Sequence, residues 1–142
     1  MNTGCAMDSK KETTYLRNQL EGTKQKYELL REWIFTTQIG HPLSNFFLRG
    51  GYRRVVIYGA GEIGLMLCQE LQMTEDIRIV CFIDRVKQDN PFGVETIQRY
   101  RAGLGEDIIV VTPTVYFEEI RAQLERDGAG RIVSLKDVIL EA

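Results

Sequence analysis

An apolar run that leads directly into a glycine-rich turn constrains the fold of this chain more than any other feature. The run is Val55-Val56-Ile57-Tyr58, and the turn is Gly59-Ala60-Gly61-Glu62-Ile63-Gly64. Apolar residues then recur with helical spacing as far as Leu71. A short buried strand, a tight turn and a helix, in this order, predict the first unit of a parallel α/β sheet.

The same alternation continues through the rest of the chain. Further strands are predicted at 77–84, 107–112 and 131–135, and helices at 114–126 and 135–140, with Ser134 placed to cap the last helix. Residues 94–100 are predicted to form a short strand that runs into a brief helix, with the boundary between the two left open. Because parallel strands are joined by right-handed crossovers, we expect four or five strands in the order 3-2-1-4-5. Residues 53–142 are thus predicted to form a Rossmann-like α/β domain, an open parallel sheet flanked by helices.

Two segments precede this domain. Residues 1–11 are small and polar and are predicted to be disordered. Residues 12–49 are predicted to form a helical appendage, with a helix at 13–37, a break at Gly40-His41-Pro42 and a short helix at 42–48. One apolar stripe at steps of four and three follows the first helix, formed by Leu16, Leu20, Thr23, Tyr27, Leu30 and Ile34.

The stripe predicts a packing or assembly role for the first helix. It would contact the α/β domain, a second copy of the chain or another protein. Gly22 and Thr23 argue against a strong autonomous coiled coil, because they weaken the helix and its apolar seam.

Bulk properties exclude several classes of function. With 18 basic and 20 acidic side chains the net charge is −2, which gives no reason to expect nucleic-acid binding. No apolar run approaches the roughly 18 residues that span a bilayer, and the first residues do not resemble a signal peptide, so we expect a cytoplasmic protein. The cysteines lack metal-ligand spacing, so no metal site is expected, and Cys68 and Cys81 are predicted to be buried thiols.

The glycine-rich turn, residues 59–64, has the context that a phosphate-binding motif requires. Gly59 permits the tight turn, Gly61 allows a pyrophosphate to approach the backbone, and Gly64 lets the helix lie close to the strand. The helix that opens at Glu62 directs unpaired N–H groups and the positive end of its dipole at that phosphate. Glu62 itself is interpreted as a first-turn acid that favours the dipole. The alternative is that the glycines only form a tight turn and bind nothing.

The predicted second strand ends in an acidic residue, Asp84, twenty residues after Gly64. An acid at this position of a dinucleotide-binding unit accepts hydrogen bonds from the ribose hydroxyl groups of an adenosine. Its carboxylate would repel a 2′-phosphate, so NAD is favoured over NADP. Arg85 follows, and either flanks the adenine or partly offsets this repulsion. A solvated aspartate at a strand end is the alternative for Asp84.

Three further residues complete the candidate site. Thr112-Pro113-Thr114 lies at the carboxyl end of the strand at 107–112, where open α/β sheets bind ligands, and its hydroxyl groups could meet a ribose or a sugar. Pro113 could equally open the following helix, with Thr112 as its cap. No catalytic set is evident, because the single histidine, His41, lies in the predicted linker and no Tyr-x-x-x-Lys pair occurs.

Residues 54–84 resemble the Rossmann-fold nucleotide-binding modules of bacterial polysaccharide-biosynthesis proteins. The similarity lies in VVIYGAGEIGLMLCQEL and IRIVCFIDR, continues through DIIVVTPTVYFEEI and RIVSLKDVI, and so covers residues 53–140. The stretch is similar to the modules of NAD-dependent sugar-nucleotide epimerases and dehydratases, and to the N-terminal domains of amino-sugar acetyltransferases that hold a UDP-sugar. Two features depart from these relatives: the Tyr–Lys pair is missing, and Asp84-Arg85 stands where the acetyltransferases often have two acids.

The resemblance implies that Gly59, Gly61, Gly64 and Asp84 bind NAD or a nucleotide-sugar. It implies a module of surface-polysaccharide synthesis that is not catalytic alone and works with a partner such as a glycosyltransferase, or with a second copy, through the N-terminal helix. The alternatives are a minimal NAD-dependent dehydrogenase or epimerase completed by a partner, and an assembly protein with a vestigial pocket.

Overall fold

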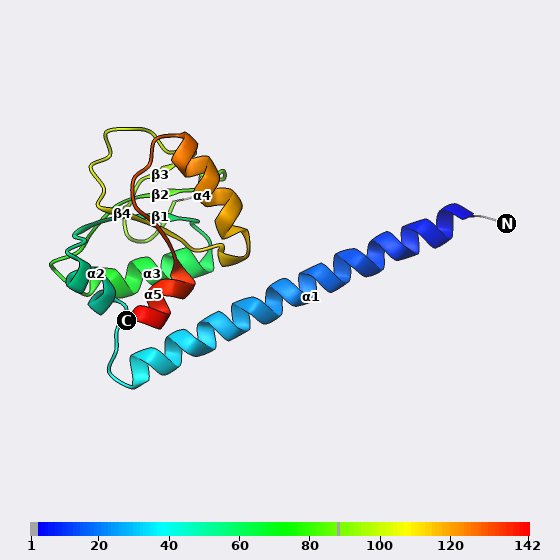
Figure 1. Ribbon diagram of the computed structural model, residues 1–142, viewed down its shortest axis with the longest axis horizontal. Helices are drawn as coiled ribbons and strands as arrows, with labels where there is room; N and C mark the ends of the chain where they lie inside the picture. Colours follow the sequence, from blue (N-terminus) through cyan, green and yellow to red (C-terminus); the bar gives the residue numbers. More distant parts are fainter. Residues whose placement is uncertain (1–2, 88) are drawn as a thin grey trace. The chain divides into compact units, whose positions relative to one another are not determined.

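The computed structural model describes residues 3–87 and 89–142, with side chains from Ser9 onward, and Figure 1 shows its helices and strands. The chain divides into two units, residues 1–35 and residues 36–142. The sequence placed residues 36–49 with the helical appendage. In the structure they belong to the second unit, where Leu43 and Phe47 are fully buried.

One long helix, α1 (Thr3–Gln38), contains most of the first unit. It begins before the predicted start at residue 13 and includes residues 3–11, for which the sequence predicted disorder; residues 1–2 of that segment lie outside the described residues. No proline interrupts α1, so no backbone donor is missing from its hydrogen-bond pattern. Gly40 ends the helix. Its φ is +86°, and its N–H group donates a hydrogen bond to the Thr37 carbonyl oxygen (3.1 Å). The predicted break is at this place.

A five-stranded parallel sheet forms the centre of residues 36–142, in the order β3-β2-β1-β4-β5. The strands are β1 (Arg54–Tyr58), β2 (Arg78–Ile83), β3 (Thr96–Ile97), β4 (Ile108–Val111) and β5 (Ile132–Ser134). β1 lies in the middle because it pairs with β2 on one side and with β4 on the other. The predicted fold class and strand order are confirmed.

Helices cover both faces of the sheet, with α2, α3 and α5 on one face and α4 on the other (Figure 1). They are α2 (Ser44–Gly50), α3 (Glu62–Gln72), α4 (Phe117–Arg126) and α5 (Leu135–Glu141), and a 3₁₀ turn (Thr114–Tyr116) precedes α4. Alternate side chains of each strand enter the two cores. Val56 and Val111 pack with Leu124 of α4, whereas Ile57 lies on the side of α3. This two-sided burial explains why the strands read as continuous apolar runs.

The structure differs from the sequence-based predictions at two local details and confirms a third. The helix predicted from residue 114 begins as a 3₁₀ turn and becomes α-helical only at Phe117. Between β3 and β4 the described chain forms bends and turns, and the brief helix considered for this region is not there. Ser134 caps α5 as predicted, because its Oγ accepts a hydrogen bond from the Lys136 N–H group (3.3 Å).

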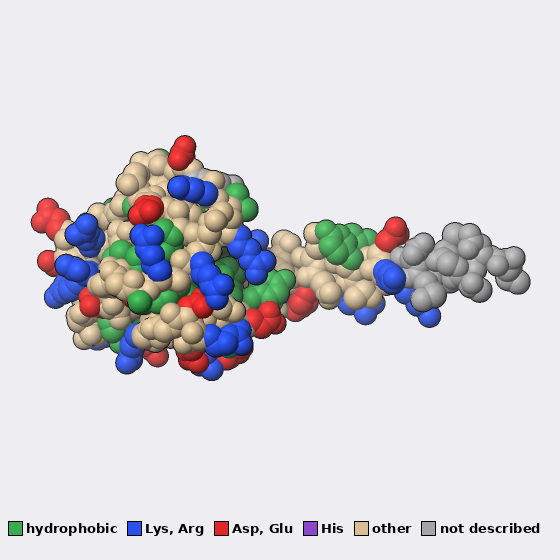
Figure 2. Space-filling model, turned by 90° about the horizontal axis from the view of Figure 1, so that it is seen from above, with side chains coloured by type: hydrophobic (Ala, Val, Ile, Leu, Met, Phe, Trp, Pro, Cys, Tyr) green, Lys and Arg blue, Asp and Glu red, His purple; other side chains and the backbone are tan. Residues whose placement is uncertain are grey.

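Cys68 and Cys81 are buried free thiols, as predicted. Burial raises the pKa of each thiol to about 11, so both stay protonated at neutral pH and act as small core residues. None of the helices within residues 3–87 and 89–142 is both long and apolar enough to cross a bilayer. Basic and acidic side chains are interspersed on the face of the molecule that Figure 2 shows.

Asp107 joins the N-terminal ends of β1 and β4. Its Oδ2 accepts hydrogen bonds from the N–H groups of Arg54 (2.9 Å) and Arg53 (2.8 Å). These bonds stabilise the ionised carboxylate, so they hold the pKa of Asp107 below its ordinary value. The charge of this exposed side chain is therefore coupled to the pairing of the two central strands.

We expect Asp107 to make the free energy of unfolding depend on pH in the acid range. Because the folded pKa lies below the unfolded one, the stabilisation is fully present above the ordinary aspartate pKa of about 3.9 and is lost as the pH falls through the lower, folded value. Urea unfolding of the wild type and of Asp107→Asn, from neutral to acid pH, measures this. The stability difference between the two proteins should close as the pH falls, and a difference that stays constant would contradict the assignment.

Candidate functional site

The candidate site lies where the chain leaves β1 and β4. Residues 59–61 follow β1, residues 112–114 follow β4, and the two strands are direct neighbours in the sheet. After β1 the chain builds β2 and β3 on one side, and it then returns to build β4 and β5 on the other. Open parallel sheets bind ligands beyond the carboxyl ends of the strands where the order reverses in this way.

Two glycines of the turn are required by packing inside the protein. Gly59 has a φ of +101°, and a Cβ atom there would lie 2.4 Å from Thr112 Oγ1. A Cβ atom at Gly64 would lie 1.9 Å from the Gly59 carbonyl oxygen. Both distances are too short for any real contact. The missing side chain at position 64 therefore lets α3 lie close to β1, and the missing side chain at position 59 leaves room for Thr112 after β4.

Gly61 has no such internal reason to be glycine. Its φ of −78° and ψ of −168° suit any residue, and no atom lies within 4 Å of a Cβ atom built there. The position is exposed and stands directly before α3. Its missing side chain therefore leaves space at the N-terminus of the helix that the protein itself does not fill.

The first turn of α3 offers N–H groups to that space. The first helical hydrogen bond runs from the Leu65 N–H group to the Gly61 carbonyl oxygen (2.9 Å), so residues 62–64 have no acceptor within the helix. Gly61, at the N-cap position, provides no side-chain acceptor for them. These N–H groups and the helix dipole favour an anion beside Gly61. Glu62 is exposed in the same turn and Ile63 is half-buried.

Asp84 is tied to the glycine turn by a hydrogen bond that sequence reasoning did not foresee. Its Oδ2 accepts from the Ala60 N–H group (2.8 Å), and its Oδ1 accepts from the Val86 N–H group (3.0 Å). The carboxylate thus fixes the turn to the end of β2. Each oxygen keeps a further lone pair for a ligand, so the predicted bond to a ribose stays a prediction. Arg85 is exposed beside it.

Thr112 lies beneath the turn and not in open space. Its side chain is buried, and its Oγ1 and its N–H group both donate to the Tyr58 carbonyl oxygen (2.7 and 3.0 Å). The prediction that Thr112 caps the following helix is wrong, because β1 binds this hydroxyl group instead. Pro113 precedes the 3₁₀ turn, and it is half-buried like Thr114. Of the two threonines, only Thr114 keeps a partly accessible side chain at the site.

Two residues that hold the site were missed from the sequence. Val86 bonds to the Asp84 side chain from two residues further on, which is the geometry of an Asx-turn, and an aspartate just after a strand is its only signal in the sequence. Gln98 donates from Nε2 to the Arg85 carbonyl oxygen (3.4 Å) and so connects the loops after β2 and β3. No sequence pattern marks this second bond.

The arrangement is suited to binding an anion rather than to moving protons. His41 precedes α2, and the nearby Leu43 N–H group bonds to Glu70 (3.2 Å), which lies roughly 12 Å along α3 from Glu62. The histidine is therefore at the far end of α3 from the glycine turn. Among the residues that the structure describes, no three His, Cys, Asp or Glu side chains gather to hold a metal ion.

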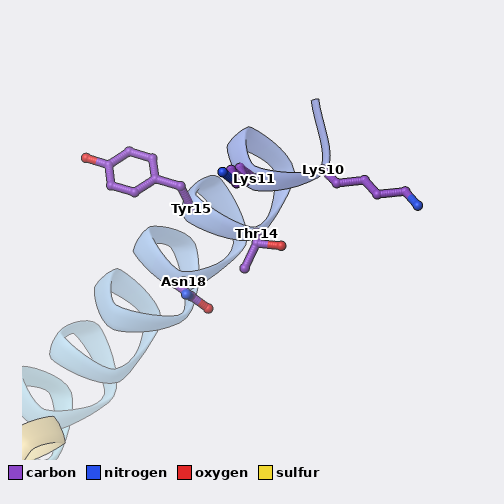
Figure 3. A pocket seen from close by; sticks show the side chains of 5 residues that line it. All are labelled: Lys10, Lys11, Thr14, Tyr15 and Asn18. Atoms are coloured by element: carbon purple, nitrogen blue, oxygen red, sulfur yellow. The ribbon is translucent and has the colours of Figure 1, made fainter. Parts of the chain in front are cut away.

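A shallow hollow on α1 is a poor alternative site. It is lined by Lys10, Lys11, Thr14, Tyr15 and Asn18. All five side chains come from about two turns of one helix, and Figure 3 shows that Tyr15 and Lys10 point away from each other. One helix alone cannot enclose a ligand, so this surface offers contact area but no cavity.

Comparison with known proteins assigns no family. No protein-family model, curated protein or solved structure matches this chain. The evidence on function therefore comes from the geometry of the glycine turn.

Proposed function

We propose that this chain is a nucleotide-binding module that holds the pyrophosphate of NAD or of a nucleotide-sugar at residues 59–64. The observation that carries the proposal is the difference between the three glycines. Gly59 and Gly64 are explained by packing, whereas the space beside Gly61 is filled by nothing in the protein. A phosphate that approaches the backbone beside Gly61 would explain why this position has no side chain.

The surrounding groups suit such a ligand. The N–H groups of residues 62–64 favour the phosphate charge, and Asp84 holds the turn that places them. The same carboxylate has lone pairs left for ribose hydroxyl groups, which supports NAD over NADP. The exposed Arg85 offers a positive charge to either kind of ligand.

The biological setting is proposed from the resemblance. Modules of this kind serve surface-polysaccharide synthesis, and we propose that this chain delivers or senses its nucleotide for a partner enzyme such as a glycosyltransferase. We propose that it is not catalytic alone: among the described residues, the carboxylates at the turn are those of Asp84 and Glu62. The Asp84 carboxylate accepts hydrogen bonds from backbone N–H groups, and the Glu62 carboxylate is exposed to solvent.

Replacing Gly61 with valine should remove nucleotide binding and leave the domain folded. The valine side chain enters the space proposed for the phosphate, so we expect affinity to fall about a hundredfold or more. Stability should fall by only about 1 kcal/mol, since valine is a poorer N-cap residue than glycine. Calorimetric titration of both proteins with NAD, NADP, UDP-sugars and CDP-sugars measures the first effect, and urea unfolding measures the second.

Gly130→Val is the matched control. Gly130 is also exposed, and a Cβ atom built there also has no neighbour within 4 Å, but it lies in the turn before β5. This variant should bind like the wild type. At a hundred times its dissociation constant, a bound nucleotide should stabilise the wild type by about 2.7 kcal/mol, which a thermal melt detects. Unchanged affinity in Gly61→Val, or binding of none of these nucleotides by the wild type, would refute the proposal.

A further inference from the structure

α1 carries a line of large apolar side chains that are exposed. Leu16, Leu20, Tyr27 and Ile34 are exposed by 62, 71, 67 and 55 % of their surfaces. Figure 2 shows apolar side chains (green) on the surface of α1 between charged ones. Exposed apolar residues in a continuous line, unlike single scattered ones, indicate a contact surface.

The spacing of this line is that of a two-helix coiled coil. Steps of three and four alternate without interruption through the heptad stripe, which is formed by Thr13, Leu16, Leu20, Thr23, Tyr27, Leu30 and Ile34. Such a repeat keeps one seam facing a second helix when the two supercoil. Gly22 lies within α1 but not in the stripe. It therefore weakens the helix by about 1 kcal/mol and leaves the seam intact.

Charges beside the heptad stripe distinguish the two possible orientations of a second α1. One edge is basic at every heptad, with Lys10, Arg17, Lys24 and Arg31 at intervals of seven residues. The other edge carries Glu12, Gln19, Lys26 and Trp33 at the same interval, and Trp33 is already buried within the single chain. In an antiparallel pair each edge faces its own copy, so the basic edges repel each other along their whole length. In a parallel pair each basic edge faces the mixed edge.

The parallel arrangement also matches the layers of the stripe. Glu12 of each helix then faces Arg17 of the other, and Gln19 faces Lys24, while Lys26 faces Arg31 as the single repulsive combination. In register, each Leu or Ile packs against its own copy, and Thr23 meets Thr23, where the two hydroxyl groups can bond to each other.

From these observations we propose that α1 binds α1 of a second copy as a parallel, in-register coiled coil. The occupant is the chain itself because, in this one orientation, each layer of the stripe meets its own copy and only the Lys26–Arg31 combination between the edges repels. Helices in proteins gain most of their stability by packing an apolar face, and pairing supplies such packing for the exposed stripe of α1. This inference is independent of what binds at the glycine turn.

Sedimentation of the full chain over a range of concentrations, about 1–200 μM, tests the pairing. We expect a monomer–dimer equilibrium in the wild type. Leu20→Glu puts two like charges into the seam and should leave a monomer. Gln25→Glu adds the same charge to the outer face of α1, away from the stripe, and should still form the dimer. A wild type that stays monomeric, or a dimer that survives Leu20→Glu, overturns the proposal.

Lys26→Glu tests the orientation. In the parallel pair it turns both repulsive contacts with Arg31 into attractive ones, so the dimer should become about tenfold tighter. In an antiparallel pair that keeps the apolar layers matched, residue 26 of one helix lies near residue 26 of the other. Two glutamates there repel each other as the two lysines do, so the dimer would not become tighter. A dimer that does not tighten would exclude the parallel arrangement. Far-UV circular dichroism of each variant shows whether the α/β unit has kept its fold.

Discussion

Gly64→Ala should destabilise the α/β unit by about 3 kcal/mol or more, although it adds a single methyl group. The added Cβ would lie 1.9 Å from the Gly59 carbonyl oxygen, which is a backbone atom held by the Gly59–Ile83 pairing between β1 and β2. Because neither partner is a flexible side chain, α3 must move away from β1, and buried contacts on that face are lost. Urea unfolding gives the free energy, and a thermal melt should shift by roughly 12 °C.

The matched control is Gly130→Ala, which adds the same methyl group where no atom lies within 4 Å. It should change the stability by less than about 0.5 kcal/mol. If both alanine variants were equally stable, the close contact of α3 with β1 would not exist as described. Together with Gly61→Val, the series separates glycines needed for folding from the one proposed for binding.

Asp84→Ala should cost about 3 kcal/mol of stability even without any ligand. It leaves the N–H groups of Ala60 and Val86 without the carboxylate that now accepts from both. Hydrogen bonds to charged groups contribute about 1.5–3 kcal/mol each, and the partial exposure of Asp84 reduces this figure. The glycine turn should loosen as well, so nucleotide affinity is expected to fall in the same variant.

Asp84→Asn is the informative companion. Its remaining oxygen can accept from Ala60, while its amide group cannot accept from Val86, so the loss of stability should be about half that of Asp84→Ala. If the Asp84 carboxylate bound only a ribose, neither substitution would change the free energy of unfolding. Both variants would then unfold like the wild type and differ from it only in titrations with nucleotide.

Sequence reasoning was sufficient for the sheet because strand order depends on features that a sequence displays. The three inner strands, β1, β2 and β4, are buried on both faces over most of their length, so each appears as an apolar run such as Ile108–Val111. The handedness of crossovers then leaves few possible orders, and the turn after β1 fixes where the order reverses. The cap at Ser134 depends on a neighbour two residues away and was predictable for the same local reason.

The candidate site was predictable only in outline because its details depend on contacts between distant residues. Thr112 reads as a helix cap next to Pro113, but its hydroxyl group bonds to Tyr58, which is 54 positions earlier. Asp84 reads as a ribose ligand, yet it also bonds to Ala60 across the sheet edge. Local patterns contain no information about which partner wins when both are within reach. The predicted start of α1 was wrong for another reason. A polar composition is typical of disordered segments, and it gives no sign of a helix where one forms.

The central place of β1 also determines when this fold can be completed during synthesis. The two strands that pair with β1, β2 and β4, begin at residues 78 and 108, and Gly59 packs against the Thr112 side chain. A chain emerging from the ribosome as far as residue 100 can pair β1 with β2, but it leaves the other edge of β1 open and apolar. Such an open edge is a template for wrong pairing with other nascent chains. Ribosome-bound intermediates of this length are therefore the ones that a chaperone would need to protect.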